Sequence, residues 1–168
     1  MDINRLATTG KSSLNSAYST TSGEILSPPL DESKLRALFT KAYGQESPSI
    51  EQWRALYADD VHFIDPTQER YGIEAYINAQ QSLAHRCDDI FLKARNIAVQ
   101  DSIAFVEWEM GLKIRGIEFI YPGATRLDLG ADGRITGHRD YFDFIGPTLG
   151  PVPVLGRFIR WLYRQLVS

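Results

Sequence analysis

The sequence predicts an α+β fold: a cone-shaped, curved, mostly antiparallel sheet covered by three helices, with an extra C-terminal helix. Two observations predict this class. Apolar residues recur at helical spacing in three segments before residue 86, and after it the period changes to that of strands over four long segments. Turn sequences separate those four segments, so we expect consecutive hairpins, which form an antiparallel meander and not a βαβ sheet.

Three helices are predicted in the first half of the domain, each with apolar residues along one face. Asp, Ser and Thr favour the position just before a helix, because their side chains accept hydrogen bonds from its first free N–H groups. The helices are expected at 31–43, capped by Asp31 or Ser33, at 49–57, capped by Ser49, and at 73–85, after Gly72.

The strands follow from runs of β-branched and aromatic residues between turn residues. A short strand at 61–65 is broken by Pro66. Four long strands are expected at 90–99, 102–115, 117–129 and 134–144. Helices laid across the concave face of such a sheet would enclose a pocket, where ligand sites commonly form.

Composition limits the classes of function. A length of 168 residues suits one domain with a core. The net charge of −3 gives no electrostatic footprint for nucleic acid, so we expect no such partner. The single cysteine, Cys87, excludes an intrachain disulfide and a cysteine-based zinc site, and the histidines lack metal-ligand spacing. We therefore expect neither a metal nor an organic cofactor.

The chain divides into three parts. Residues 1–28 are predicted to be a disordered polar tail, because 12 of the 17 residues between Thr8 and Glu24 are Ser, Thr, Asn or Gly. The folded domain is expected at 29–145, and a Pro/Gly linker with a terminal helix at 146–168. No apolar run reaches the roughly 20 residues of a membrane span, and the N-terminus lacks an apolar signal-peptide core. A cytoplasmic protein is expected.

The terminal helix combines an apolar stripe with a basic one and carries no acid. A basic amphipathic helix with aromatic residues at its boundary can lie in a membrane interface. The alternative is that the helix caps the cone or packs in an oligomer. The side chains expected to contact the membrane, at its inner face, or a partner are Arg157, Arg160, Trp161 and Arg164.

Two acids are the candidate catalytic residues, because each lies at or near the end of an apolar strand. Two carboxyl groups around one cavity can take different protonation states and so divide acid and base roles. Asp65 can instead cap the turn at Pro66, and Asp140 can instead be a structural partner of Arg126 or His138. His138 shares a strand face with Asp140, so it either orients that acid or is a hydrogen-bonded core residue.

Aromatic residues on the same elements could form the walls of the pocket. Glu107 and Glu109 alternate with Trp108, so either the acids or the aromatic face inward, and burial favours the aromatic. The predicted pocket residues are Phe63, Tyr76, Trp108, Phe119, Tyr121 and Phe142.

The order of elements, the segment LYADDVHFIDP (56–66) and the closing strand GRITGHRDYFD (133–143) together resemble the nuclear-transport-factor-2-like superfamily, over about residues 31–145. Its members include SnoaL-like polyketide cyclases, ketosteroid isomerases and limonene epoxide hydrolases. The resemblance implies the cone-shaped fold. Because dimers are common among these relatives, it also implies a homodimer.

In ketosteroid isomerases the Asp before the Pro is the proton-shuttling base, and Asp65 matches it. Their two oxyanion donors, a Tyr and a protonated Asp, fall near Lys41 and Gly123 here, so both donors are absent from those positions. In limonene epoxide hydrolases an Asp-Arg-Asp arrangement activates water, and Asp140 matches one Asp. Trp108 and Met110 stand near the positions of the Arg and the other Asp.

The residues and the resemblance lead to one expectation. A small hydrophobic molecule binds in the cone and undergoes cofactor-free acid/base chemistry of the isomerase, cyclase or hydrolase type. Asp65 would be the base and Asp140 the acid or water-activating partner, with His138 in support. The alternatives are a non-enzymatic ligand- or lipid-binding or adaptor module, and an epoxide hydrolase.

Overall fold

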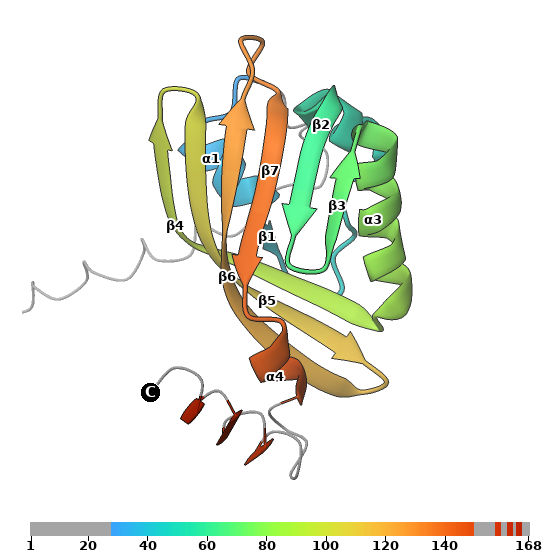
Figure 1. Cartoon of the computed structure of the whole chain (residues 1–168). Helices are drawn as coiled ribbons and strands as arrows, with labels where there is room; N and C mark the ends of the chain where they lie inside the picture. The colour runs from blue at the N-terminus through green and yellow to red at the C-terminus, as the bar shows by residue number, and fades with distance from the viewer. Residues whose placement is uncertain (1–27, 150–156, 159–160, 163, 166–168) are drawn as a thin grey trace, which may run out of the picture.

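The computed structural model describes residues 28–149 together with 157–158, 161–162 and 164–165 (Figure 1). Seven strands form one sheet in the order β1-β4-β5-β6-β7-β2-β3, and four helices flank it. In chain order the elements are α1 (Glu32–Leu38), β1 (Thr40–Lys41), α2 (Ile50–Leu56), β2 (Tyr57–Asp65), β3 (Gln68–Tyr71), α3 (Ile73–Arg86), β4 (Asp89–Gln100), β5 (Ile103–Ile114), β6 (Ile117–Leu129), β7 (Ile135–Phe142) and α4 (Ile145–Leu149).

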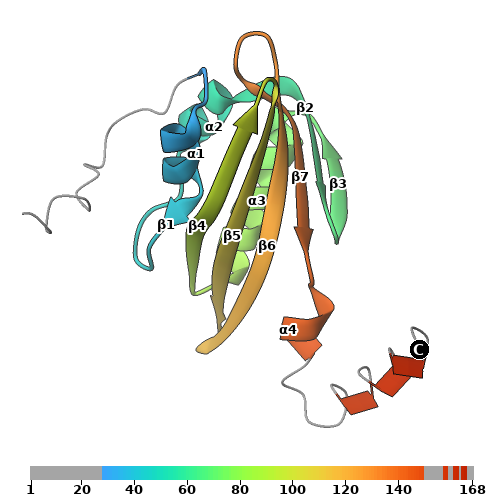
Figure 2. The ribbon, with the colours of Figure 1, turned by 90° about the vertical axis from the view of Figure 1, so that its left-hand side faces the viewer.

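The sheet confirms the predicted fold class. β4 to β7 form the expected meander, and only one neighbouring pair of strands, β2 with β7, is parallel. The sheet is strongly curved, and α3 lies across its concave face (Figure 2). The parallel pair matters for the site, because it places the end of β2 beside the end of β7.

The helix starts follow from their capping residues. The Asp31 side chain accepts from the backbone N–H of Lys34 at the start of α1. Ser49 and Gln52 form a reciprocal capping box at the start of α2. The first helix is shorter than predicted: it ends at Leu38, and Thr40 and Lys41 pair with β4 instead. Thr40 and Lys41 pair with backbone groups at the edge of β4, which would lack these partners if the helix continued.

Two further segments differ from the sequence prediction. Residues 68–71 form β3, which pairs antiparallel with β2, where a loop was expected. Its residues are polar and it lies at the edge of the sheet, so no apolar alternation marks it. The expected linker begins with the short helix α4, where the Asp143 carboxylate accepts from the N–H groups of Ile145 and Gly146.

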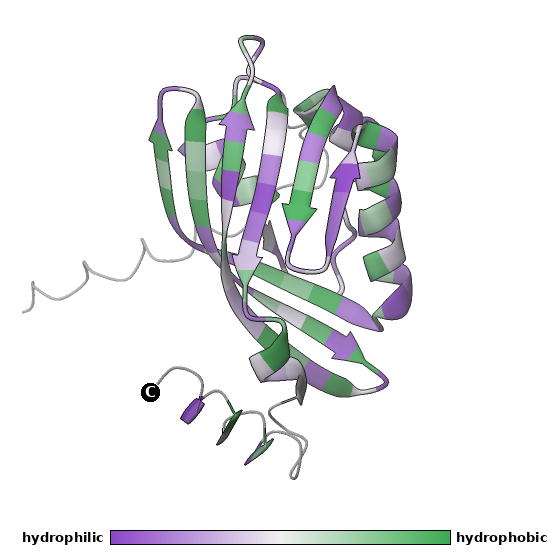
Figure 3. Ribbon diagram, viewed as in Figure 1, coloured by the Kyte–Doolittle hydropathy of each residue, from purple (hydrophilic) through white to green (hydrophobic). Residues whose placement is uncertain are grey.

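The core lies between the concave face of the sheet and the helices. Hydrophilic and hydrophobic residues follow one another along the strands, as expected for strands that bury one face (Figure 3). Its most deeply buried side chains come from helices and sheet alike: Leu35, Leu56, Tyr57, Val61, Tyr76, Val106, Thr125, Leu127 and Ile135. The N-terminal tail predicted at 1–28 lies outside the described residues, except for its last residue.

Candidate functional site

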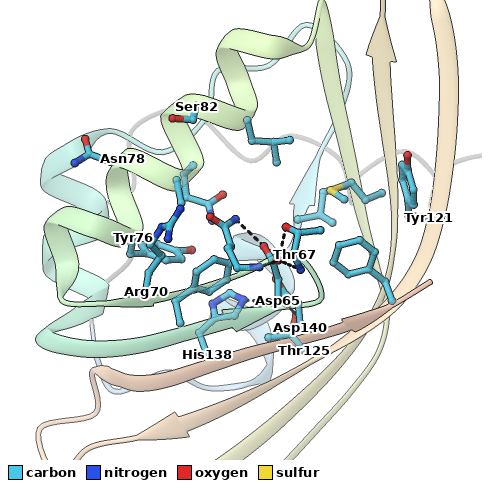
Figure 4. A pocket seen from close by; sticks show the side chains of 18 of the residues that line it. Asp65, Thr67, Arg70, Tyr76, Asn78, Ser82, Tyr121, Thr125, His138 and Asp140 are labelled. Atoms are coloured by element: carbon cyan, nitrogen blue, oxygen red, sulfur yellow. Dashed lines mark hydrogen bonds and ion pairs between the residues drawn. The ribbon is translucent and has the colours of Figure 1, made fainter. Parts of the chain in front are cut away.

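A cavity of about 680 Å³ opens between α3 and the concave face of the sheet. Its volume is within the usual range of ligand pockets, about 300–1,000 Å³. Most of its walls are aromatic or aliphatic, and among the described residues the only acids that line it are Asp65 and Asp140. The structure therefore brings the two acids singled out by the sequence to one cavity (Figure 4).

The parallel pairing of β2 with β7 explains why the two acids meet. Phe63 pairs with His138 in this register, and both side chains are buried on the concave side. Asp65 and Asp140 each follow two residues later, so they share the same face. Neighbouring strands lie about 4.8 Å apart, so β2 and β7 present the two acids to one cavity although they are 75 positions apart in the sequence.

Asp65 caps the turn between β2 and β3. Its Oδ1 accepts from the backbone N–H of Thr67 at 2.6 Å, from the Thr67 hydroxyl at 2.7 Å and from the backbone N–H of Gln68 at 3.0 Å. Its Oδ2 accepts from the Gln68 side-chain amide at 2.7 Å. The turn-capping role that the sequence left open is thus present, and most of this carboxylate's capacity to accept is already in use.

Asp140 is held through one oxygen only. Its Oδ1 accepts from the Thr125 hydroxyl at 2.5 Å and pairs with His138 Nε2 at 2.9 Å. Thr125 is in turn fixed by the Trp108 indole, whose Nε1–H donates to its hydroxyl oxygen at 2.7 Å. Asp140 Oδ2 has no hydrogen-bond partner among the described residues, and none of their buried side-chain N or O atoms lacks one. Oδ2 is therefore the atom of this side chain that faces the cavity.

His138 links Asp140 to two buried tyrosines. The Tyr76 hydroxyl donates to the Tyr57 oxygen at 2.9 Å, and the Tyr57 hydroxyl lies 2.9 Å from His138 Nδ1. In the tautomer with its ring hydrogen on Nε2, Nδ1 accepts from the Tyr57 hydroxyl and Nε2 donates to Asp140. The histidine therefore both belongs to the core and orients the acid.

The two tyrosines are kept protonated by their surroundings. Burial, opposed in part by the hydrogen bond from Tyr76, raises the pKa of Tyr57 above its usual value. Burial also raises the pKa of Tyr76 well above its usual value, with a further contribution from Tyr57. Both hydroxyl groups therefore remain hydrogen-bond donors throughout the physiological range of pH.

Five of the six predicted wall residues line the cavity: Phe63, Tyr76, Trp108, Tyr121 and Phe142. Phe119 does not. It follows the alternation of β6 on the same face as Tyr121, but lies nearer the hairpin, opposite Leu112. The aromatic of the Glu-Trp-Glu run is the inward residue, as burial favoured. Glu109 pairs with Arg95, and Glu107 accepts from Asn96, on the outer face of the sheet.

The positions of the ketosteroid isomerase oxyanion donors have other occupants. A Cβ atom at Gly123 would stand 2.4 Å from Cη2 of the Trp108 ring, so this aromatic fills the place of a side chain there. Lys41 Nζ donates to the carbonyl of Ile90 at 2.7 Å, and this lysine does not line the cavity. The polar groups around Asp140 therefore differ from those implied by that resemblance.

Residues of the hydrogen-bonded site that were missed from the sequence include Tyr57, Thr67, Gln68 and Thr125. Thr125 alternates on β6 with Tyr121, so strand period alone could have placed it inward. Tyr57 was assigned to the end of a helix, whereas it begins β2. No sequence pattern placed Gln68 in the site, because β3 was not expected.

The structure bears less directly on the predictions about metal binding and about the C-terminal contacts. The described residues hold no group of three or more His, Cys, Asp or Glu side chains that could bind a metal ion. Of the predicted membrane or partner contacts, Arg157, Trp161 and Arg164 are helical and exposed, while Arg160 lies outside the described residues. Within the part of the chain that the structure describes, no helix is long and apolar enough to cross a membrane.

Comparison with known proteins agrees with the fold. A family model described as a SnoaL-like domain matches residues 35–138, more than half of the chain. No curated protein sequence matches significantly. The chain resembles a hypothetical protein with a ketosteroid isomerase-like fold from Catenulispora acidiphila, solved in complex with trimethylamine, at 19% identity and a TM-score of 0.58, over 77% of this chain and 92% of that one.

Two further solved structures show the same fold. An LEH-like epoxide hydrolase from M. tuberculosis is 20% identical with a TM-score of 0.53, covering 66% of this chain and 82% of its own. A candidate SnoaL-like polyketide cyclase from Jannaschia sp. CCS1 is also 20% identical with a TM-score of 0.53, covering 58% and 74%. At these identities the likeness concerns architecture alone.

Proposed function

This chain belongs to the SnoaL-like domain family, and we propose that its cavity binds a small, largely apolar molecule and transfers a proton on it without a cofactor. The observation that carries the proposal is Asp140, whose Oδ1 is fixed by two donors while Oδ2 faces the cavity. A carboxylate held in this way can accept a proton from a bound molecule without having to reorient.

The walls of the cavity support an apolar ligand. Aromatic and aliphatic side chains from α1, α3 and the sheet surround it, including Leu38, Phe63, Leu83, Leu92 and Met110. Such walls favour an apolar body through the hydrophobic effect. Polar residues also line the cavity: Asp140, His138 and Thr125 lie on the sheet, while Asn78, Ser82 and Arg86 come from α3. Such groups can orient a ligand for reaction.

The proposed step is abstraction of a proton next to a carbonyl group. Asp140 Oδ2 forms an O–H bond as the substrate C–H bond breaks, and the electron pair moves into the enolate. When a double bond is conjugated with the enolate, return of the proton from Asp140 to the far carbon completes an isomerisation. When the enolate carbon instead attacks a second carbonyl, the new C–C bond leaves an alkoxide, and the proton on Asp140 passes to this oxygen to complete a cyclisation. The Nε2–H of His138 and the Thr125 hydroxyl act as positioning groups, because they hold the other oxygen.

Asp140 is a better candidate for the base than Asp65. Four donors from the β2–β3 turn engage Asp65, three of them at one oxygen. Removing a proton from substrate would compete with those bonds. Asp65 fits better as a positioning group of the cavity wall, held in place by the β2–β3 turn.

Epoxide hydrolysis receives less support. The Asp-Arg-Asp arrangement of limonene epoxide hydrolases needs an arginine beside the catalytic acid, whereas the side chains bonded to Asp140 are Thr125 and His138. A non-enzymatic binding module is the stronger alternative. The hydrogen bonds of Asp65 are all explained by its structural role in the turn, which favours a binding module. A binding module predicts ligand binding without turnover.

Deuterium exchange tests the proposal. The protein is incubated in D₂O with 2-tetralone, a small apolar ketone with acidic hydrogens next to its carbonyl, and incorporation is followed by mass spectrometry. We expect exchange above the uncatalysed rate, and an Asp140→Asn variant to lose it by about 100-fold or more, typical of a missing general base. Asp65→Asn, the matched acid variant, should retain more of the rate than Asp140→Asn.

Binding is measured separately with the fluorescent apolar dye 1-anilinonaphthalene-8-sulfonate, displaced by 2-tetralone. Displacement without exchange would favour the binding module. Equal exchange by the wild-type chain and Asp140→Asn would remove Asp140 from the mechanism.

A further inference from the structure

The C-terminal part of the chain differs in charge from the rest. Residues 144–168 contain three arginines and no acid. The whole chain has 18 basic and 21 acidic residues, so the part before residue 144 has 15 against 21 and a net charge of −6. A cationic segment attached to an acidic domain favours an anionic partner.

Exposed apolar side chains concentrate in the same part. Five of the twelve large hydrophobic residues exposed among the described positions come after β7, a small fraction of the described chain. They are Phe144 (44% exposed), Ile145 (54%), Phe158 (55%), Trp161 (56%) and Leu162 (41%). Solvent exposure of this much apolar surface, next to positive charge, marks an interaction site.

The described residues of the terminal segment have the pattern of an interfacial helix. Phe158 and Leu162 are four apart, so they share one helix face. Arg157, Trp161 and Arg164 follow at intervals of four and three and form the neighbouring face. The rings of Phe158 and Trp161 are 6.0 Å apart, which brings the aromatic residues to the boundary between the two faces. Tryptophan favours this boundary in helices that lie in a lipid headgroup layer.

Exposed residues at the start of α4 and just before it lie beside the cavity. Phe144 lines the cavity, and its ring stacks on that of Tyr121. The Tyr121 hydroxyl lies 2.9 Å from that of Thr148, which fixes α4 at this end of the sheet. Phe144 and Ile145 therefore lie where an apolar molecule could enter the cavity.

We propose that Phe144, Ile145 and the helical residues Phe158, Trp161 and Leu162, with the arginines beside them, dock the chain on the surface of an anionic lipid bilayer. The apolar side chains enter the interface and the arginines pair with lipid phosphates. Attachment is peripheral. One consequence rests on the proposed function: the substrate would be an apolar molecule dissolved in the membrane, delivered at Phe144.

Vesicle sedimentation of the full chain tests the docking. Vesicles of phosphatidylcholine alone are compared with vesicles that also contain phosphatidylglycerol. We expect sedimentation with the anionic vesicles only, reduced by high salt. Each arginine near an anionic surface contributes about five-fold to partitioning, so a double variant Arg157→Gln with Arg164→Gln should bind roughly 25-fold more weakly.

Matched variants separate the docking surface from general effects. Phe158→Ser with Trp161→Ser should also weaken sedimentation. Arg115→Gln with Arg139→Gln, at exposed arginines of the β5–β6 turn and of β7, should leave it unchanged. The proposal is overturned if the wild-type chain stays in the supernatant with anionic vesicles, or if either C-terminal variant sediments like wild type.

A change of oligomeric state in the C-terminal variants, measured by light scattering, with sedimentation unaltered would also overturn it and identify a packing surface between protein chains. Because no turnover is measured, failure of docking leaves the proposed function intact.

Discussion

Alkaline pH should destabilise the protein through Tyr57 and Tyr76. Both are fully enclosed, and burial raises the pKa of each above the value near 10 that it has in the unfolded chain. Below pH 10 both tyrosines are protonated in the folded and in the unfolded chain, so the stability that they contribute is fully present. Above pH 10 the unfolded chain loses protons that the folded chain keeps, so stability falls as pH rises.

The magnitude follows from the number of protons retained. Each buried tyrosine adds a slope of about 1.4 kcal/mol per pH unit to the loss of unfolding free energy, so the pair adds about 2.7 kcal/mol per unit. Burial and the Glu118 carboxylate raise the pKa of Tyr43 to about 12, which adds a background common to all variants. Tyr57→Phe and Tyr76→Phe should each remove about half of the slope due to the pair.

Urea unfolding at several values of pH between neutral and about 11 gives this slope directly, since loss of a hydrogen bond changes the intercept and not the pH dependence. Tyr141→Phe serves as the control, because its side chain is exposed. The reasoning fails if Tyr57→Phe and Tyr76→Phe unfold with the same pH dependence as wild type. Tyrosinate absorbance of wild type and of the two Phe variants should show that Tyr57 and Tyr76 ionise only when the chain unfolds.

Three other substitutions test the site. Asp65→Asn should lower the unfolding free energy by about 1–3 kcal/mol in urea titrations, because the turn donors lose a charged acceptor; no loss would show that the cap is dispensable. Thr125→Val should cost about 1–3 kcal/mol, since the Trp108 indole N–H is left without its acceptor, and should lower kcat more than it changes KM. Gly123→Ala should cost about 1–3 kcal/mol by overpacking against Trp108, with a changed near-ultraviolet circular dichroism spectrum; an unchanged spectrum would contradict the close contact.

The fold could be predicted because its signals are local. Ser49 and Gln52 carry a capping box in the sequence, and the four long strands alternate between apolar and polar residues over many positions. β1 and β3 were not predicted, because each is short and polar. β1 is held by pairing with the distant β4, and β3 by pairing with the neighbouring β2. Such pairing is a tertiary property, which outweighs the local preference of Thr40 and Lys41.

The candidate site could be predicted in part. Asp65, His138 and Asp140 were found from strand ends and from a resemblance, and they line one cavity. Their separate roles could not be read from the sequence, because they depend on which oxygen accepts which donor. The turn around Asp65 engages both of its oxygens, whereas β6 supplies Asp140 with Thr125 and leaves Oδ2 open.

A crystal structure of the chain with bound 2-tetralone tests the central claim most directly. We predict that the ketone lies in the cavity between α3 and the sheet, with an α-carbon about 3–3.5 Å from Asp140 Oδ2, the separation of a near-attack geometry. A ketone bound elsewhere, or an Oδ2 bonded to a protein donor and turned away from the ligand, would contradict the account.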